Sequence, residues 1–282
     1  MSPESAPVGN KFNLSTAELQ EMAKKLRRHV IIMIATAGSG HPGGSLSAAD
    51  IITALYFKVL RHNPQDPQWL DRDRFILSKG HAAPILYAAL AETGYFPEVE
   101  LATLRKLNSH LQGHADRKFT PGVEMSSGSL GMGLSFAIGV ALAARLDSKD
   151  YRTCVLLSDG ECEEGQTWEA ILSAAHFKLD NLTAIVDYNG IQLSGWIRDI
   201  MNLEPFTQKW QAFGWHIIDI DGHDFDQILS AYQEAEKIKG KPAVIVAHTI
   251  KGKGVSFMEN NVAFHGKAPT QEEAERALKE LE

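Results

Sequence analysis

The stretch of sequence that decides the fold runs from Thr153 to Asn189 and reads TCVLLSDGECEEGQTWEAILSAAHFKLDNLTAIVDYN. Two β-rich apolar segments, 153–157 and 182–186, lie on either side of a segment with the apolar spacing of a helix. The stripe expected to bury that helix consists of Trp168, Ile171, Leu172 and Ala175. A strand, a helix and a returning strand predict a βαβ unit with parallel strands.

Further strand patterns lie on both sides of this unit. We expect them at 74–77, 216–220 and 243–247. Strands that alternate with helices predict an α/β fold, in which a doubly wound, mostly parallel sheet carries helices on both faces. Residues 1–12, rich in Pro, Ser and Gly, are expected to form a flexible tail, and residues 13–282 a single domain.

Helix-start signals give more local predictions. A helix over 14–37 is expected with Ser15 or Thr16 as its N-cap, and the Gly-rich run 38–44 is expected to be a loop. Ser47-x-x-Asp50 reads as a capping box for a second helix that ends near Leu60. A capped amphipathic helix is expected from Thr270 onward.

Composition excludes several classes of protein. The 28 Lys and Arg against 35 Asp and Glu give a net charge of −7, which argues against a nucleic-acid-binding surface. The longest uncharged run, 125–144, holds eight Gly or Ser among its twenty residues, so we expect a loop and a buried helix and not a membrane span. With two cysteines and no apolar leader, the chain is expected to be cytoplasmic with reduced thiols.

Polar turns follow the two strands of the central unit. Asp159-Gly160 follows the first strand and Asn189 the second, so both side chains should lie at the same edge of the sheet. A carboxylate and an amide oxygen suit Mg²⁺ or Ca²⁺, which would also bind phosphate oxygens, and Gly160 would let a phosphate approach the backbone. Ordinary turn residues are the alternative, because Asp and Asn are common after strands.

Several motifs resemble the transketolase family. They are Ser39-Gly40-His41-Pro42-Gly43, Asp73-Arg74-Phe75-Ile76-Leu77-Ser78-Lys79-Gly80-His81-Ala82, Pro121-Gly122-Val123-Glu124, Gly128-Ser129-Leu130-Gly131, Asp159-Gly160-Glu161-Cys162-Glu163-Glu164-Gly165 and Phe264-His265-Gly266. They occur in the family's order from about Leu14 to Pro269. The resemblance implies the thiamine diphosphate-binding fold and, as cofactors, thiamine diphosphate and Mg²⁺ (or Ca²⁺).

The resemblance also implies roles for individual residues. The metal would be held by Asp159, Asn189 and the backbone carbonyl of Ile191, and the cofactor would be contacted by His81, Gly128, Leu130, Gly160, Glu164, Ile250 and His265. The catalytic set would be His41, His81, His114 and His265, of which His41, His114 and His265 would point at the sugar. Glu164 and Glu169 would lie at a subunit contact that links two active sites.

The chemistry of these residues agrees with the implied roles. Neutral histidines donate and accept hydrogen bonds near physiological pH, and they suit proton transfer on a sugar. A single histidine would more often be structural, which is the interpretation kept for His29, His62, His176 and His216.

Transketolases carry three domains, and this chain resembles the first alone. The resemblance therefore implies the N-terminal subunit of a split transketolase, a transferase that moves a two-carbon ketol unit between sugar phosphates. We expect it to be inactive without a separate subunit that carries the pyrimidine-binding and C-terminal domains, with two copies of each chain.

Four stretches depart from the family pattern: Ser158, Gly128-Ser129-Leu130-Gly131, Ala115-Asp116 and Lys251-Gly252-Lys253-Gly254. They bear on the substrate and not on the cofactor. The alternatives are a subunit of another thiamine diphosphate enzyme (1-deoxyxylulose-phosphate-synthase-like or 2-oxo-acid-dehydrogenase-like), a non-catalytic cofactor-binding remnant, and a nicotinamide oxidoreductase, which would need a better fingerprint than 128–133 offers.

Overall fold

A computed structural model describes residues 12–282 of the chain. The tail expected at 1–12 lies outside the described residues except at its last position. Phe12 packs against the core, with its ring centroid 5.1 Å from that of Phe57. The aromatic ring of Phe12 buries apolar surface there.

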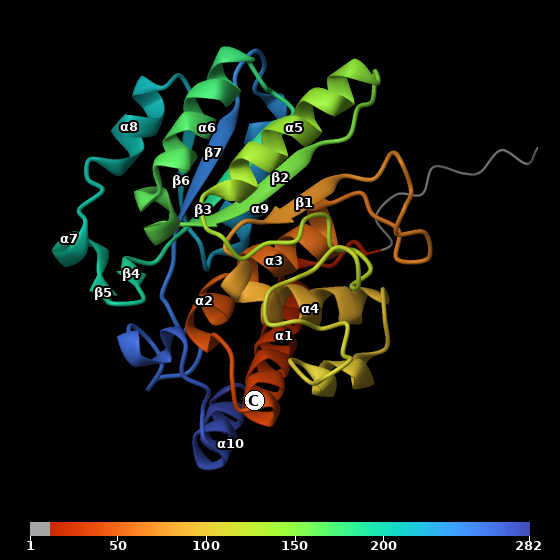
Figure 1. Cartoon of the computed structure of the whole chain (residues 1–282), viewed down its shortest axis with the longest axis vertical. Helices are drawn as coiled ribbons and strands as arrows, with labels where there is room; N and C mark the ends of the chain where they lie inside the picture. The colour runs from red at the N-terminus through yellow and green to blue at the C-terminus, as the bar shows by residue number, and fades with distance from the viewer. Residues whose placement is uncertain (1–11) are drawn as a thin grey trace, which may run out of the picture.

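The sheet has five strands in the order β1-β2-β3-β7-β6, and every pair in it is parallel (Figure 1). Its strands are β1 (Arg74–Leu77), β2 (Thr153–Ser158), β3 (Leu182–Tyr188), β6 (His216–Asp221) and β7 (Ala243–His248). All five expected strands are confirmed. A short antiparallel hairpin, β4 (Ile191–Gln192) and β5 (Gly195–Trp196), follows β3.

Side chains alternate between two hydrophobic clusters along each strand. On β2, Cys154 and Leu156 join one cluster, whereas Val155 and Leu157 join the other. The period of two follows from the pleat of a strand that is buried on both faces. The expected doubly wound architecture is confirmed.

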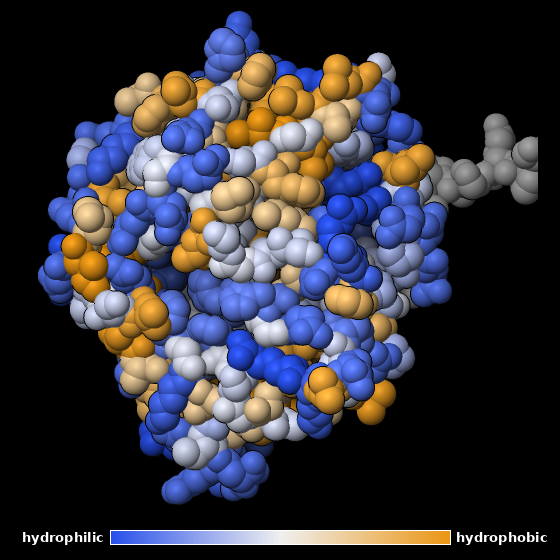
Figure 2. Space-filling view, in the orientation of Figure 1, coloured by the Kyte–Doolittle hydropathy of each residue, from blue (hydrophilic) through white to orange (hydrophobic). Residues whose placement is uncertain are grey.

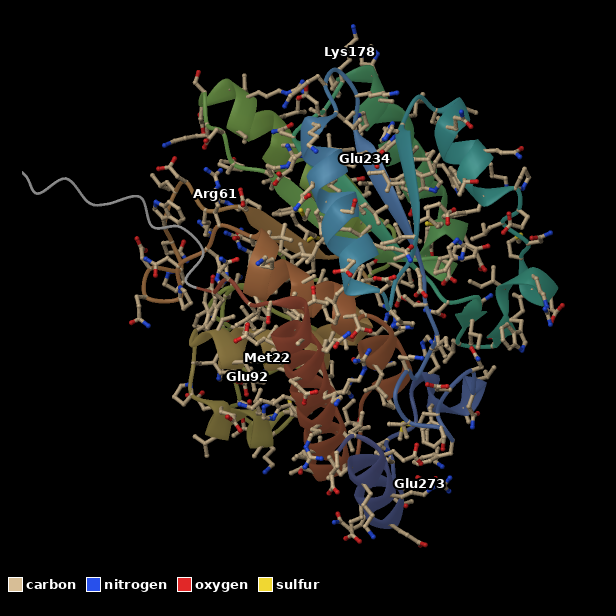
Figure 3. All side chains as sticks on the ribbon, turned by 180° about the vertical axis from the view of Figure 1, so that it is seen from behind. Met22, Arg61, Glu92, Lys178, Glu234 and Glu273 are labelled. Carbon is tan, nitrogen blue, oxygen red and sulfur yellow. The ribbon has the colours of Figure 1, made fainter. Side chains whose placement is uncertain are left out.

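Helices cover both faces of the sheet. One face carries α5 (Met132–Leu146), α6 (Gly165–His176) and α8 (Phe206–Ala212); the other carries α1 (Thr16–Ala37), α3 (Ala49–Ala54), α4 (Ala83–Thr93) and α9 (Phe225–Lys237). Figure 3 shows this second side from behind, with α9, marked by Glu234, across the sheet and α1, marked by Met22, below it. The shorter elements are α2 (Pro42–Ser47), η1 (Leu55–Val59), η2 (Gly80–Ala82), η3 (Glu98–Thr103), η4 (Gly160–Glu163), α7 (Ile197–Ile200), η5 (Val262–His265) and α10 (Gln271–Glu280).

The apolar stripe predicted for α6 is wrong at Leu172, whose exposed fraction is 56%. The buried positions of α6 are Thr167, Ala170, Ile171 and Ala174. Leu172 follows Ile171 by one residue, a rotation of about 100° that turns it away from the sheet.

The helix caps predicted at Ser15 and Thr270 are present, and both are capping boxes. Ser15 caps α1 with Glu18, and Thr270 caps α10 with Glu273, and in both the side chain and backbone bonds are reciprocal. Both predicted helix starts are confirmed. They can be predicted from the sequence because each cap bonds to a residue only three positions away.

The capping box predicted at Ser47 and Asp50 is wrong. The helical segment begins earlier, at Pro42, so the predicted loop is shortened to Gly38–His41. Proline suits the first helical position because its missing N–H would be unpaired there. Ser47 and Asp50 are both buried and bond to distant residues instead, which contribute more than a local cap would.

Within residues 12–282, every helix is too short or too polar to cross a membrane. The uncharged run 125–144 forms a loop followed by most of α5, as the sequence predicts.

Candidate active site

The site lies where β2 and β3 end. Asp159 directly follows β2 and Asn189 follows β3, and both are buried, with exposed fractions of 1% and 6%. Together with the backbone of Ile191 they line one cavity of about 160 Å³. Adjacent parallel strands thus bring Asp159 and Asn189 to one place, as the spacing predicts, and Ile191, the third ligand that the resemblance implies, joins them from β4.

The carboxylate of Asp159 is held by backbone groups. Its Oδ1 accepts from the N–H of Gly160 at 2.8 Å, and its Oδ2 accepts from the N–H of Gly190. Burial raises the pKa of Asp159, and the nearby charge of Asp187 raises it further. A buried carboxylate of this kind favours a cation beside it.

The other two ligand candidates also carry oxygen into the cavity. The amide oxygen of Asn189 accepts from the N–H of Ile191 at 3.1 Å. The carbonyl of Ile191 accepts from the Lys251 ammonium at 2.6 Å. A positive charge therefore already lies at the carbonyl that the family pattern assigns to the metal.

Lys251 is a site residue that sequence reasoning missed, since it appears there only as a departure from the family. Its exposed fraction is 3%, and Nζ lies 2.9 Å from Nδ1 of His265. Burial lowers the pKa of Lys251, and the neighbouring charge of Lys79 lowers it further. No local pattern shows that a lysine about 60 residues after Ile191 reaches the same cavity.

A buried ion pair forms the floor of the site. Lys79 and Asp187 are both fully buried and bonded to each other. Asp187 also accepts from Ser47 at 2.6 Å and from Thr249, and Lys79 donates to the carbonyl of Gly44 at 3.0 Å. These contacts join α2, the ends of β1 and β3, and the turn after β7.

Four expected catalytic histidines gather above this floor. The ring centroid of His41 lies 5.6 Å from that of His81, 6.1 Å from that of His114 and 5.6 Å from that of His265. His81 and His265 stack at 5.2 Å. They come from segments up to 224 residues apart in sequence (265 minus 41), so the fold alone brings them together.

The four histidines are neutral at physiological pH. Burial, aided by nearby cations, lowers the pKa of His41 to about 4 and that of His265 to about 3. Burial also lowers the pKa values of His81 and His114. The cluster therefore offers hydrogen-bond donors and acceptors without positive charge.

The Gly128–Gly131 loop is held against this cluster. Leu130 lines the cavity, and a Cβ added to Gly128 would lie 3.7 Å from the His114 ring. The buried carboxylate of Glu161 accepts from the N–H of Gly131 at 2.8 Å and from the hydroxyl of Ser78. Glu161 thereby ties the loop to the end of β1.

The remaining expected residues lie away from the cavity. Ile250 lines a neighbouring cavity of about 590 Å³, and His114 lines a third, of about 740 Å³, with Arg105 and Ser39. Glu164 and Glu169 are exposed at the start of α6 and within it. Glu164 packs close to Gly131, because a Cβ added to Gly131 would lie 2.9 Å from the Cβ of Glu164.

The residues present fit a metal-bound diphosphate. A carboxylate, an amide oxygen and a carbonyl suit a hard divalent cation, and two buried lysines suit an anion. Nδ1 of His41 is buried with no hydrogen-bond partner, as is the hydroxyl of Ser127. Buried polar atoms are usually paired in folded proteins, and a bound ligand beside the histidine cluster would be one way to pair these two. Figure 2 shows polar residues across the middle of this face and a hollow beside them.

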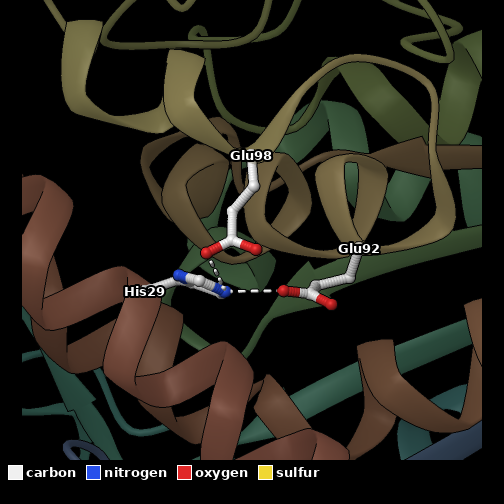
Figure 4. Close-up of side chains that lie close together, drawn as sticks. All are labelled: His29, Glu92 and Glu98. Atoms are coloured by element: carbon white, nitrogen blue, oxygen red, sulfur yellow. Dashed lines mark hydrogen bonds and ion pairs between the residues drawn. The ribbon is translucent and has the colours of Figure 1, made fainter.

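A second group of ligand-type side chains lies outside this site. His29 of α1 contacts Glu92 of α4 at 2.7 Å and Glu98 of η3 at 3.8 Å (Figure 4). The Lys25 ammonium lies 2.7 Å from Glu92 and 3.9 Å from Glu98. Lys25 supplies the positive charge that these carboxylates need, so the group is an ion-pair network that joins three elements.

Comparison with known proteins agrees with the motifs. Residues 19–281 match the family model for the transketolase thiamine diphosphate-binding domain. The chain therefore belongs to the transketolase family, as its thiamine diphosphate-binding part.

Relatives of two lengths match the chain. It is 45% identical to the 6-deoxy-6-sulfo-D-fructose transketolase subunit SqwG of Clostridium sp. (strain MSTE9), over 94% of this chain and 96% of that protein. It is 43% identical to an apulose-4-phosphate transketolase subunit of Actinobacillus succinogenes, over 96% of this chain and 99% of that protein.

Single-chain transketolases match over less than half of their own length. Among solved structures, the transketolase of Campylobacter jejuni is 35% identical with a TM-score of 0.90 and covers 95% of this chain, which spans 43% of that protein. The human transketolase is 42% identical over 93% of this chain, which spans 42% of its length.

Proposed function

We propose that this chain is the thiamine diphosphate-binding subunit of a two-chain transketolase, which transfers a two-carbon ketol unit between sugars. One observation carries the proposal. Asp159, Asn189 and the Ile191 carbonyl line a single cavity with two buried lysines, beside four neutral histidines.

In this proposal the cavity holds the metal and the diphosphate. Asp159, Asn189 and the carbonyl of Ile191 bind Mg²⁺ or Ca²⁺, and the N–H of Gly160 and the rings of His81 and His265 face the diphosphate. When bound, thiamine diphosphate supplies the nucleophilic carbon and the electron sink for cleavage of a carbon–carbon bond. Gly128, Leu130 and Ile250 position the aromatic part of the cofactor.

The histidines bind the sugar and move its protons. Because burial keeps His41 and His265 neutral, each ring can accept a hydrogen bond from a sugar hydroxyl, which is the contact through which a proton would be transferred. His114 lines the wider cavity, where the rest of the sugar chain would lie.

The partner is a separate polypeptide with pyrimidine-binding and C-terminal domains, and two copies of each chain form the assembly. The close similarity to proteins named as transketolase subunits over 96–99% of their lengths supports this division. The exposed Glu164 and Glu169 are available for a contact between subunits. A cytoplasmic location fits Cys154 and Cys162, which are both free and buried.

The substrate is an acyclic ketose with an anionic terminal group, a phosphate or a sulfonate. The names of the two relatives with the same architecture support it, since one acts on a sulfonated fructose and the other on apulose 4-phosphate. Both acceptor and donor would carry several hydroxyls, which suits four neutral imidazoles.

The experiment combines cofactor binding with turnover. Asp159→Ala should abolish binding of thiamine diphosphate with Mg²⁺ in calorimetry and leave the fold intact by circular dichroism. The exposed Asp199→Ala is the matched control and should bind as the wild type does. Turnover of phosphorylated and sulfonated ketoses, and of 2-oxo acids, is then measured with and without the partner subunit.

Three results would overturn the proposal. Unchanged cofactor affinity in Asp159→Ala would remove the assigned metal site. Robust ketol transfer by the purified chain alone would remove the two-chain division, and activity on 2-oxo acids in place of ketoses would favour the 2-oxo-acid-dehydrogenase-like alternative.

A further inference from the structure

A histidine behind the site bridges two segments that are far apart in sequence. His223 lies between β6 and α9, and its side chain is 13% exposed. Its Nδ1 lies 2.7 Å from Oδ2 of Asp50 on α3, and its Nε2 lies 2.9 Å from the backbone nitrogen of Ile250. The ring therefore connects α3 to the turn that follows β7.

The backbone N–H of Ile250 fixes the tautomer of His223. A backbone N–H can only donate, so Nε2 must be the acceptor and must carry no proton. The ring proton then lies on Nδ1 and is donated to Asp50. Either a proton on Nε2 or a doubly protonated ring would direct two N–H groups at each other.

Asp50 is itself held rigidly. It accepts two hydrogen bonds from the Arg27 guanidinium of α1, at 2.9 and 2.6 Å, and both side chains are buried. Asp50 cannot rotate away without leaving Arg27 unpaired, which is costly for a buried charge. The position of Nε2 is thus set from the helical layer behind the site.

The turn that receives this bond carries site residues. Thr249 donates to Asp187 in the floor of the site, and Lys251 reaches the Ile191 carbonyl and His265. His223 borders cavities of about 410 and 590 Å³, and Ile250 lines the larger of them. Because these cavities lie beside the turn, packing alone does not fix the position of its backbone, and hydrogen bonds must do so.

We propose that His223, as the neutral Nδ1–H tautomer fixed by Asp50, is a positioning residue that holds the Thr249–Lys251 turn at the cofactor site. The inference rests on the proposed function, because the turn matters to catalysis only if the cavity binds thiamine diphosphate. His223 itself acts through the backbone of Ile250 and does not line the cavity that Asp159 and Asn189 share.

The test compares three variants of the full chain with its partner subunit present. His223→Phe keeps a flat ring and removes the acceptor, whereas His223→Gln keeps an oxygen that can accept from the N–H of Ile250. His248→Gln is the matched control, because His248 also pairs with an aspartate at 2.7 Å (Asp219) but is exposed and does not bond to the turn.

The expected results are specific. Loss of one backbone-anchoring hydrogen bond in His223→Phe should weaken binding of thiamine diphosphate with Mg²⁺ about tenfold. His223→Gln should recover most of the affinity, and His248→Gln should match the wild type. In hydrogen exchange, the Ile250 amide should be protected in the wild type and His223→Gln and exposed in His223→Phe.

A measurement on the wild type needs no substitution. The ¹⁵N spectrum of the His223 ring should show a protonated Nδ1 and a non-protonated Nε2. The opposite tautomer would overturn the inference even if His223→Phe did not fold. Wild-type affinity in a folded His223→Phe would also overturn it and leave the proposed function standing, whereas a wild type that binds no cofactor would overturn both.

Discussion

Replacing Asp187 by asparagine should destabilise the protein strongly. The change preserves the shape of the side chain and removes the negative charge that faces Lys79. Both partners are 0% exposed, so water cannot replace the lost charge. Burial alone would raise the pKa of Asp187, but the charge of Lys79 and the hydrogen bonds from Lys79, Ser47 and Thr249 together outweigh burial and lower that pKa.

The magnitude follows from what remains after the change. Asp187 accepts from Lys79, Ser47 and Thr249, whereas asparagine has a single acceptor oxygen and a new NH₂ group. Lys79 would keep the Gly44 carbonyl at 3.0 Å and at most one neutral amide oxygen, with no negative charge to face its own. Breaking a buried ion pair in this way costs about 3–5 kcal/mol of unfolding free energy. For a protein of this size the melting temperature should fall by roughly 6–20 °C.

The assay is thermal and urea unfolding of Asp187→Asn, with Asp71→Asn as the matched control. Asp71 also pairs with a lysine, Lys149 at 2.7 Å, but both are partly exposed, so this variant should melt like the wild type. Adding Lys79→Met to Asp187→Asn should recover part of the loss. A loss below about 1 kcal/mol in Asp187→Asn, or single-variant losses that simply add, would refute the reasoning.

The other predictions concern two glycines and the histidine cluster. Gly80→Ala would place a Cβ 2.9 Å from the Gly128 nitrogen and 2.6 Å from the Ser127 hydroxyl, so it should displace that loop and weaken cofactor binding about tenfold by calorimetry; unchanged affinity would contradict it. Gly139→Ala meets nothing within 4 Å on α5 and should stabilise the chain by about 0.5–1 kcal/mol in urea unfolding, and a loss of stability would contradict the open space there. The pKa of His41 falls from 6.5 to about 4 on folding, so as the pH drops His41 is protonated first in the unfolded chain. Proton uptake favours the unfolded state, so the folded protein loses stability as the pH falls from 6.5 toward 4. NMR titration should show no protonation of His41 above pH 5, and a midpoint near 6.5 would contradict the burial argument.

The sequence predicts those parts of the site that depend on neighbouring strands. Asp159 and Asn189 lie at the ends of one βαβ unit, so a local pattern is enough to bring them together. The histidines needed the family resemblance, because only the fold places His41 beside His265.

The supporting residues could not be predicted in this way. Lys251, Asp187 and the pair formed by Asp50 and His223 act through contacts across 60 to 173 residues of chain. Asp50 illustrates the reason: its spacing from Ser47 suits a helix cap, but Arg27 and His223 offer a buried carboxylate stronger partners.

The order of strands has a consequence for synthesis on the ribosome. β7 is the last strand to be made, yet it separates β3 from β6 in the finished sheet. Until residues 243–248 leave the exit tunnel, β3 keeps an unpaired edge and β6 has no strand to join. The sheet therefore cannot close until residues 243–248 have emerged, and during that interval its unpaired strand edges are where chaperones would be needed.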